Sequence, residues 1–225
     1  MRGPSWPGFA GLRLAASRPG GPGADGAAAQ ISAVVLAAGQ SRRMGRPKMS
    51  LAWGESTVIG RVTSVLLSAG VDEVIVVTGG GSREVEEALK GSAARIVYNP
   101  DFAVAEMTRS LQTGLAACSP QSAAALVALG DQPQIEAGIV RAILAEFRNT
   151  PAALVVPSYR MRRGHPWVAA RALWPELLAL PSERTLRDFL NEKAAEIHYL
   201  TVDSPSVLMD LDTPEDYRKY HPPSA

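Results

Sequence analysis

The chain has 225 residues, with 23 lysines and arginines against 22 aspartates and glutamates. This near-neutral balance gives no electrostatic basis for a nucleic-acid or membrane partner, and no segment approaches the ~20 apolar residues of a membrane span. The single cysteine, Cys118, excludes an internal disulfide, and three histidines elsewhere leave no Cys/His cluster for zinc or iron. We expect one well-buried domain in a reducing, cytoplasmic setting.

Residues 1–30 differ in composition from the rest of the chain. They are rich in glycine, proline and alanine, and Asp25 is their only acidic residue. An apolar stretch ending at Leu12 is interrupted at once by Arg13, unlike the core of a signal peptide. The composition predicts a disordered tail at 1–30, followed by one domain over 31–225.

From Ile31 onward, short β-rich runs alternate with helical patterns. Strands are expected at 31–36, 73–78, 95–98, 123–129, 154–157, 167–169, 197–202 and 207–209. Helices are expected at 58–69, 82–89, 107–117, 136–147, 173–180 and 185–191, and after the N-cap Thr213. This alternation predicts an α/β fold, a single-domain three-layer α/β/α sandwich with a Rossmann-like, mostly parallel sheet.

The loop after the first strand has the composition of a phosphate-binding site. It combines small residues, which let backbone N–H groups approach phosphate oxygens, with cations, which supply positive charge. These residues are Ala37, Ala38, Gly39, Arg42, Arg43 and Lys48. The spacing is that of neither a Walker A loop nor a dinucleotide-binding loop. We expect Lys48, at the end of the loop, to be solvated.

Residues 36–48 read L-A-A-G-Q-S-R-R-M-G-R-P-K. They resemble, position for position, the signature of the MobA-like nucleotidyltransferases, L-A-[AG]-G-x-[SG]-x-R-M-G-x-x-K. The resemblance implies the sheet of the nucleotide-diphospho-sugar transferases and a catalytic role for Arg43 and Lys48. It also implies a nucleotide-binding role for Leu36, Ala37, Ala38, Gly39, Gly45 and Lys48.

Carboxylates follow two of the expected strands. Asp131 stands in G-D-Q-P at the tip of an apolar strand and suits a hard cation such as Mg²⁺. Asp210 and Asp212 belong to D-L-D-T-P-E-D, which resembles the family's D-x-D-T-P-E-D ending, and alternate residues of an extended segment face the same side. The family resemblance makes Asp131 catalytic and metal-binding, with Asp210 or Asp212 as second ligand. A turn aspartate and ordinary helix capping are the alternatives.

Residues 99–115 resemble a run found in one branch of the family, N-P-x-[YF]-A-x-G-E-M-x-x-S-L-Q-x-G-L, with Ala105 in place of a glycine. Asn99 and Ser110 are therefore candidates for ribose or base contacts, and Thr78, at the end of the second strand, joins them. Structural capping is the alternative for Asn99 and Ser110. The glycine triplet at 79–81 is interpreted as a flexible strand-to-helix turn that could border the base or ribose, in preference to a phosphate loop.

A second polar cluster, R-R-G-H-P at 162–166, matches the R-x-G-H-P segment that molybdopterin-type members of the family place beside the acceptor. Its cations suit a phosphate-bearing acceptor. Arg163, Gly164 and His165 are therefore candidate acceptor-binding residues. A structural His-Pro loop is the alternative.

The activity that the resemblance implies is nucleotidyl transfer. An acceptor phosphate attacks the α-phosphorus of a nucleoside triphosphate, Mg²⁺ and Lys48 stabilise the developing charge, and pyrophosphate leaves. Within the family L-A-A-G accompanies cytidylyl transfer to molybdenum cofactor, which favours CTP, with a molybdenum hydroxylase or its chaperone as a further partner. The alternatives are the same chemistry on a sugar phosphate or other alcohol phosphate, and a non-catalytic nucleotide-binding assembly module.

Overall fold

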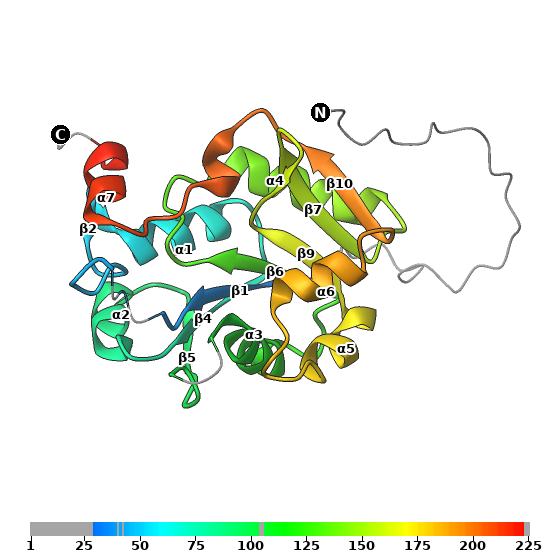
Figure 1. Cartoon of the computed structure of the whole chain (residues 1–225), viewed down its shortest axis with the longest axis horizontal. Coiled ribbons are helices and arrows are strands. Elements are labelled where there is room, and N and C mark those ends of the chain that lie inside the picture. The colour runs from blue at the N-terminus through cyan, green and yellow to red at the C-terminus, as the bar shows by residue number, and fades with distance from the viewer. Residues whose placement is uncertain (1–28, 40, 42, 104–105, 223–225) are drawn as a thin grey trace, which may run out of the picture.

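The computed structural model describes residues 29–39, 41, 43–103 and 106–222. The expected tail as far as residue 28, Arg42 of the phosphate loop and the substituted Ala105 lie outside the described residues. Through the rest of the chain runs one large sheet with helices on both faces (Figure 1). The predicted α/β class is confirmed.

The order of the strands across the sheet is β10-β7-β9-β6-β1-β4-β5, and the short β8 pairs with β7. Their bounds are β1 (Ile31–Ala37), β4 (Glu73–Thr78), β5 (Arg95–Tyr98), β6 (Ala124–Leu129), β7 (Leu154–Tyr159), β8 (Arg162–Arg163), β9 (Trp167–Ala170) and β10 (Ile197–Thr201). Strand β1 is parallel to both of its neighbours, β4 and β6, whereas β9 is antiparallel to β6 and to β7. The sheet is therefore mixed but mostly parallel, as predicted.

Two helical layers cover the two faces (Figure 1). One layer contains α1 (Val58–Ser68), α2 (Ser82–Ala88) and α4 (Ala137–Asn149), and the other α3 (Glu106–Ala117), α5 (Trp174–Leu178) and α6 (Leu186–Glu192). Every residue of β1 is buried, and its side chains alternate between two cores, with Val35 in one and Val34 in the other. A strand buried on both faces reads as a continuous apolar run, which explains why this strand was easy to predict.

The end of the chain differs from the predicted pattern. The expected strand at 207–209 is wrong, because residues Pro205–Leu208 form a 3-10 helix, η2. Pro205 has no N–H to give to a sheet, and the Ser204 side chain caps the turn by accepting from the Ser206 backbone N–H. The predicted cap of the last helix, α7 (Pro214–Tyr220), is confirmed, with a reciprocal capping box between Thr213 and Asp216.

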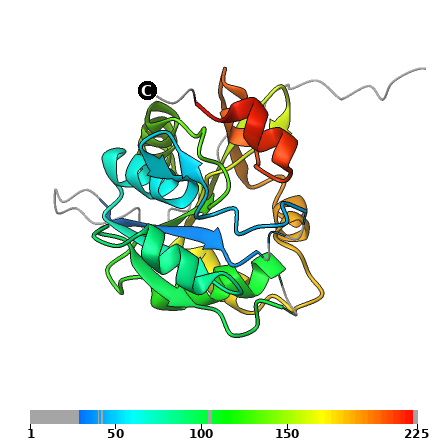
Figure 2. The same ribbon diagram turned by 90° about the vertical axis from the view of Figure 1, so that its left-hand side faces the viewer.

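A short hairpin, β2 (Ala52–Trp53) and β3 (Ser56–Thr57), follows the β1 loop and was not predicted. Helix α7 packs against it, because the Trp53 and Tyr217 rings meet edge to face and the Tyr217 hydroxyl donates to the Ala52 carbonyl at 2.6 Å. Figure 2 turns this end of the molecule toward the viewer, with α7 in red above the blue loop that follows β1. Within the described ranges, every helix is too short or too polar to traverse a bilayer.

Helix α3 lies unusually close to β1 at Gly114. A Cβ atom built on Gly114 would come within 2.3 Å of a Val34 methyl carbon. The contact therefore requires glycine, which has no Cβ atom, at this position. The close approach fixes the distance between the helix and the strand that leads into the site.

We predict that Gly114→Ala lowers the free energy of unfolding by about 1–3 kcal/mol, because the added methyl overpacks the α3–β1 contact. The matched control is Gly138→Ala in α4, where a Cβ meets no atom of the described residues within 4 Å. Alanine there should leave stability unchanged or raise it by about 0.5–1 kcal/mol. Urea denaturation measures both, and equal effects of the two changes would contradict the packing argument.

Candidate active site

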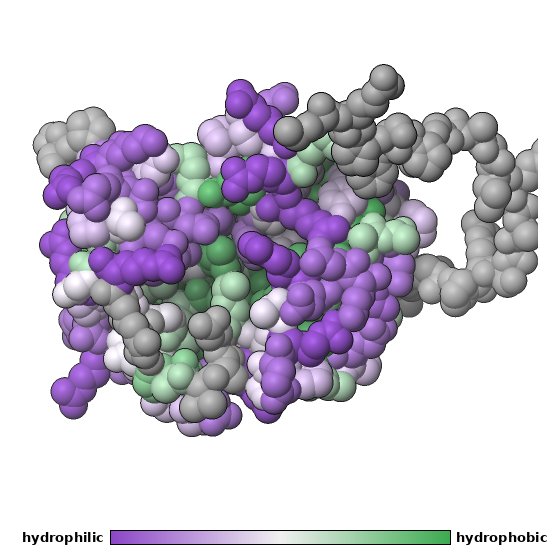
Figure 3. Space-filling view, viewed as in Figure 1, coloured by the Kyte–Doolittle hydropathy of each residue, from purple (hydrophilic) through white to green (hydrophobic). Residues whose placement is uncertain are grey.

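The connections of the sheet change direction beside β1. From β1 the chain moves to β4 and β5 on one side, and after α3 it returns to β6 on the other side. Ligands of open α/β sheets bind beyond the carboxyl ends of the strands at such a switch point. The loops that follow β1 and β6 therefore form the candidate site, where the surface is hollowed between hydrophilic rims (Figure 3).

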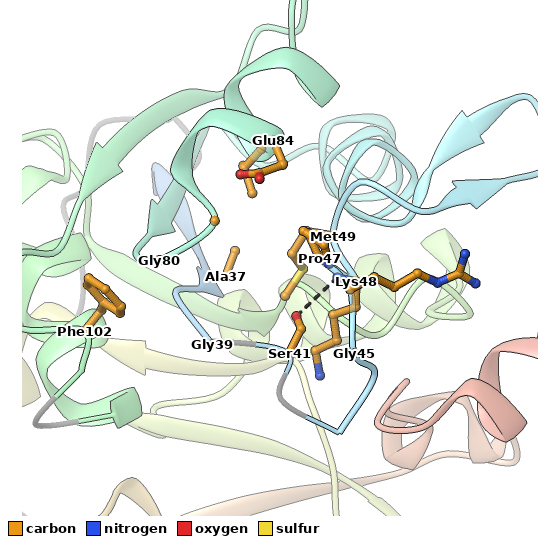
Figure 4. Close-up of a pocket in the computed structure, with 13 residues that line it drawn as sticks. Ala37, Gly39, Ser41, Gly45, Pro47, Lys48, Met49, Gly80, Glu84 and Phe102 are labelled. Carbon is orange, nitrogen blue, oxygen red and sulfur yellow. Dashed lines mark hydrogen bonds between the residues drawn. The ribbon is translucent and has the colours of Figure 1, made fainter.

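Two adjoining hollows lie there, each with a volume of about 590 Å³. The first is lined by the β1 loop, by the start of α2 and by Phe102, and Figure 4 shows Phe102 across the hollow from Lys48. The second holds the three candidate carboxylates, Asp131, Asp210 and Asp212. Both share Gly39, Lys48, Met49 and Phe102. They are two parts of one cleft with Lys48 between them.

Lys48 is held by hydrogen bonds rather than by solvent. It is only 8% exposed, so the expectation of a solvated lysine is wrong. Its Nζ donates to Asp131 Oδ2 at 2.5 Å, to the Leu211 carbonyl at 3.0 Å and to Asp212 Oδ1 at 3.4 Å. Burial alone would lower the pKa of the ammonium, but Asp131 and Asp212 outweigh it and raise that pKa.

Backbone hydrogen bonds bring the segments around Lys48 together. The Gly130 N–H donates to the Leu36 carbonyl at 3.0 Å, which fixes the tip of β6 beside the tip of β1. The Leu211 N–H donates to the Asp131 carbonyl at 3.0 Å, which fixes the segment before α7 against the same tip. The structure thus brings together three segments that are far apart in the sequence.

Two other predicted residues complete the polar cluster. Arg43 is exposed, and its Nη1 lies 3.4 Å from Asp212 Oδ2. Asp210 opens onto the second hollow and accepts from Gln132 Nε2 at 2.6 Å. Loss of hydration and the charges of Asp131 and Asp212 raise the pKa of Asp210, against the lowering effect of Gln132.

The donor set fits a divalent cation in its chemistry, because three carboxylates with hard oxygen atoms line one hollow. Among the described residues no group of three or more His, Cys, Asp or Glu side chains is already gathered around one metal-binding point. Lys48 instead provides the positive charge between Asp131 and Asp212. Lys48 therefore offsets the charge of Asp131 and Asp212 but does not pair with Asp210 among the described residues.

Most of the residues assigned to the nucleotide lie in the cleft. Lining residues are Ala37, Gly39, Gly45 and Lys48 in the first hollow and Leu36, Ala38, Gly39, Lys48 and Ser110 in the second. Gly45 has φ +68°, a conformation that disfavours other residues. Their roles toward a nucleotide remain predictions.

Thr78 and Asn99 line neither of these hollows, and both are buried. Asn99 accepts from the Asp101 N–H at 3.0 Å and donates from Nδ2 to Ser110 Oγ at 3.1 Å. It therefore connects the end of β5 to α3, in line with the structural alternative, and its contact with a ribose or base stays a prediction. Thr78 Oγ1 lies 3.5 Å from Ser82 Oγ at the start of α2.

Several lining residues were not singled out from the sequence. Phe102 packs against Gly79 and Gly80, where any Cβ would come within 3 Å of its ring or Cβ atom. The glycine triplet is thus a strand-to-helix turn, as interpreted, and Gly80 and Gly81 also border the first hollow. The aromatic position in the N-P-x-[YF]-A run was a signal that could have identified Phe102.

The three candidate acceptor residues lie apart from both hollows. Arg163 donates to Asn191 Oδ1 at 2.8 Å and to the Tyr199 hydroxyl at 2.9 Å. Gly164 packs against Val207, and the His165 N–H donates to the Val207 carbonyl at 2.9 Å. Burial lowers the pKa of His165 from 6.5 to about 4. Their part in acceptor binding stays a prediction.

Comparison with known proteins identifies the family. The model for the MobA-like NTP transferase domain matches residues 33–197, most of the chain. The chain belongs to this family. Its members and its fold make it a nucleotidyltransferase, and the resemblance seen in the β1 loop is confirmed.

Individual relatives agree. The chain is 27% identical over 190 residues to the molybdenum cofactor cytidylyltransferase of Escherichia coli K12, covering 83% of this chain and 93% of that protein. The crystal structure of Rv0371c from Mycobacterium tuberculosis H37Rv is 31% identical, with a TM-score of 0.76 over 86% of this chain and 98% of that one. A structure of Rv0371c in complex with manganese matches at 30% identity and a TM-score of 0.72, over 85% of this chain and 98% of that one.

The lowered pKa of His165 predicts an acid-sensitive fold. Below pH 6.5 the unfolded chain protonates this histidine, whereas the folded protein does not do so until about pH 4. Stability is therefore lost as the pH falls through this window, by up to about 3 kcal/mol from this group. Denaturant unfolding between pH 7 and pH 4 should show that His165→Asn loses less free energy of unfolding than the wild type. Identical losses in the two proteins would show that the pKa of His165 is not lowered by folding.

Proposed function

We propose that the chain is a CTP:molybdenum cofactor cytidylyltransferase that releases pyrophosphate. The single observation that carries the proposal is the second hollow, where the Ala38 methyl lies in the same cavity as Lys48 and Asp131. The small-residue wall suits a nucleotide base, and the charged wall suits its phosphates. The similarity to the E. coli cytidylyltransferase supports the same substrates.

Lys48 and Arg43 are the cations that meet the triphosphate. The acceptor phosphate oxygen forms a bond to the α-phosphorus, and the bond from that phosphorus to the pyrophosphate oxygen breaks. Charge moves onto the departing oxygen, where a fixed ammonium stabilises it more than it stabilises the ground state. Lys48 is held in the cleft by Asp131 and the Leu211 carbonyl, and its long contact with Asp212, at 3.4 Å, is the one that would give way to a phosphate oxygen.

The divalent cation of the reaction is proposed to be Mg²⁺, held by Asp131 with Asp210 or Asp212. A divalent cation held there would supply positive charge to offset the negative charge that develops on the phosphates. The manganese complex of Rv0371c supports a divalent cation in this family. Asp131, Asp210 and Asp212, which line the second hollow, are the residues that would hold it.

No side-chain nucleophile is required by this reaction. A phosphate acceptor is already anionic, so holding it in line with the α-phosphorus supplies much of the rate. The acceptor is proposed to reach the cleft from the side of Arg163, Gly164 and His165. The product would pass to a molybdenum hydroxylase or its chaperone.

Two alternatives keep part of this account. The same chemistry on a sugar phosphate or other alcohol phosphate remains open because the three acceptor residues line neither hollow. A non-catalytic nucleotide-binding module is disfavoured, because both Lys48 and Asp131 are present and lie 2.5 Å apart in the cleft. The acceptor that supports turnover distinguishes the first alternative from the proposed function. Any turnover by the protein would exclude the second alternative.

Base choice is the first prediction of the proposal. The Ala38 methyl narrows the hollow, so the wild type should use CTP in preference to GTP, and Ala38→Gly should weaken that preference by about ten- to two-hundred-fold. Pyrophosphate release with molybdenum cofactor as acceptor gives kcat/KM for both nucleotides on one protein. Equal use of GTP by the wild type would refute cytidylyl specificity while leaving nucleotidyl transfer intact.

Removal of the central charge is the second prediction. Lys48→Met keeps the length of the side chain and should lower kcat/KM by at least about 100-fold, because the transition state loses its fixed cation. Lys90→Met is the matched control, since Lys90 is exposed and pairs only with the neighbouring Glu87 at 3.6 Å among the described residues. Thermal melting curves check that both variants are folded. Wild-type turnover in a folded Lys48→Met variant would contradict the catalytic role given to Lys48.

A further inference from the structure

Gln132 directly follows Asp131 at the tip of β6, and its side chain is buried. It is only 2% exposed. Its amide nitrogen lies 2.6 Å from Asp210 Oδ1 and 3.4 Å from the Val207 carbonyl oxygen. A buried amide this close to a carboxylate restricts where that carboxylate points.

Asp210 differs from the other two carboxylates of the second hollow. Asp131 and Asp212 both pair with Lys48, and Asp212 also pairs with Arg43. Within the described part of the chain Asp210 forms no ion pair, and its close partner is the neutral amide of Gln132. A neutral donor orients a carboxylate without cancelling its charge, which leaves that charge available to a ligand in the hollow.

The alternative is that Gln132 only secures the backbone of η2. The contact with Val207 gives this alternative little support, because the Val207 carbonyl already accepts a hydrogen bond from the His165 N–H at 2.9 Å. The Gln132 contact with the same oxygen is long, at 3.4 Å, whereas the contact with Asp210 is short. The geometry therefore ties Gln132 mainly to Asp210.

We infer that Gln132 is a positioning residue, whose amide aims the Asp210 carboxylate into the hollow toward the divalent cation that accompanies the nucleotide. In its link to the nucleotide, the inference rests on the proposed function. Residues that hydrogen-bond cation-binding carboxylates typically contribute about 10- to 100-fold in metal affinity or activity. Gln132 would thus act on the reaction without touching a reacting atom.

The chain supplies a matched control two positions further on. Both polar atoms of the Gln134 amide are buried, and neither has a hydrogen-bond partner among the residues that the structure describes. Replacing Gln134 by the similarly shaped methionine removes no hydrogen bond, whereas the same change at Gln132 removes the contact with Asp210. The pair separates the loss of orientation from the general effect of an apolar side chain in this loop.

The test is a double-mutant cycle read by Mn²⁺ binding to the protein alone, measured by electron paramagnetic resonance. Gln132→Met should raise the Kd for Mn²⁺ about tenfold or more, and Gln134→Met should leave it unchanged. In an Asp210→Ala background, Gln132→Met should add less than about a twofold change, because an orienting residue has nothing left to orient. If Gln132→Met does not fold, Gln132→Leu takes its place.

Three outcomes would overturn the inference: an unchanged Kd in Gln132→Met, an equal loss in the Asp210→Ala background, or no Mn²⁺ binding by the wild type. Pyrophosphate release is measured in parallel on the same proteins. Absence of turnover in the wild type with an intact binding cycle would refute the proposed function and leave the positioning role standing.

Discussion

The contact between Lys48 and Asp131 is the interaction on which the site depends. The two residues are 83 positions apart in the chain, and their charged atoms lie 2.5 Å apart. Three carboxylates at one end of a sheet would repel one another, and the repulsion would grow as they lose water. The ammonium of Lys48 offsets this repulsion, and it lies between the two hollows where we propose that the phosphates of a nucleotide bind.

The sheet topology is what makes this contact possible. Because β1 lies between β4 and β6, its carboxyl end is joined to the residue that follows β6 by the backbone hydrogen bond from Gly130 to Leu36. The last segment of the chain returns to the same tip through Leu211, and α7 then closes over the β2–β3 hairpin through Tyr217. A nucleotide in the cleft would contact loops that are anchored on both sides, and anchored loops lose little entropy on binding.

Much of this could be predicted from the sequence, and the reason is local. Buried parallel strands such as β1 are continuous apolar runs, and the phosphate loop and the G-D-Q-P turn carry their chemistry in adjacent residues. The rest depends on contacts between distant segments. Three features each involve a partner that no spacing rule indicates. They are the burial of Lys48, the pairing of Gln132 with Asp210 and the structural contacts of Asn99. The apolar run at 207–209 was misassigned because its proline and its serine cap, not its hydrophobicity, decide its conformation.

The central claim is that the α-phosphate of CTP, and with it the cytidylyl group, is transferred to a phosphate-bearing acceptor. The direct measurement follows CTP labelled at the α-phosphorus or at the γ-phosphorus, incubated with the protein, Mg²⁺ and molybdenum cofactor. The account predicts that the α-label appears in the acceptor product in amounts equal to the pyrophosphate released, and that the γ-label appears only in pyrophosphate. Recovery of the γ-label in the acceptor, or of neither label, would contradict it.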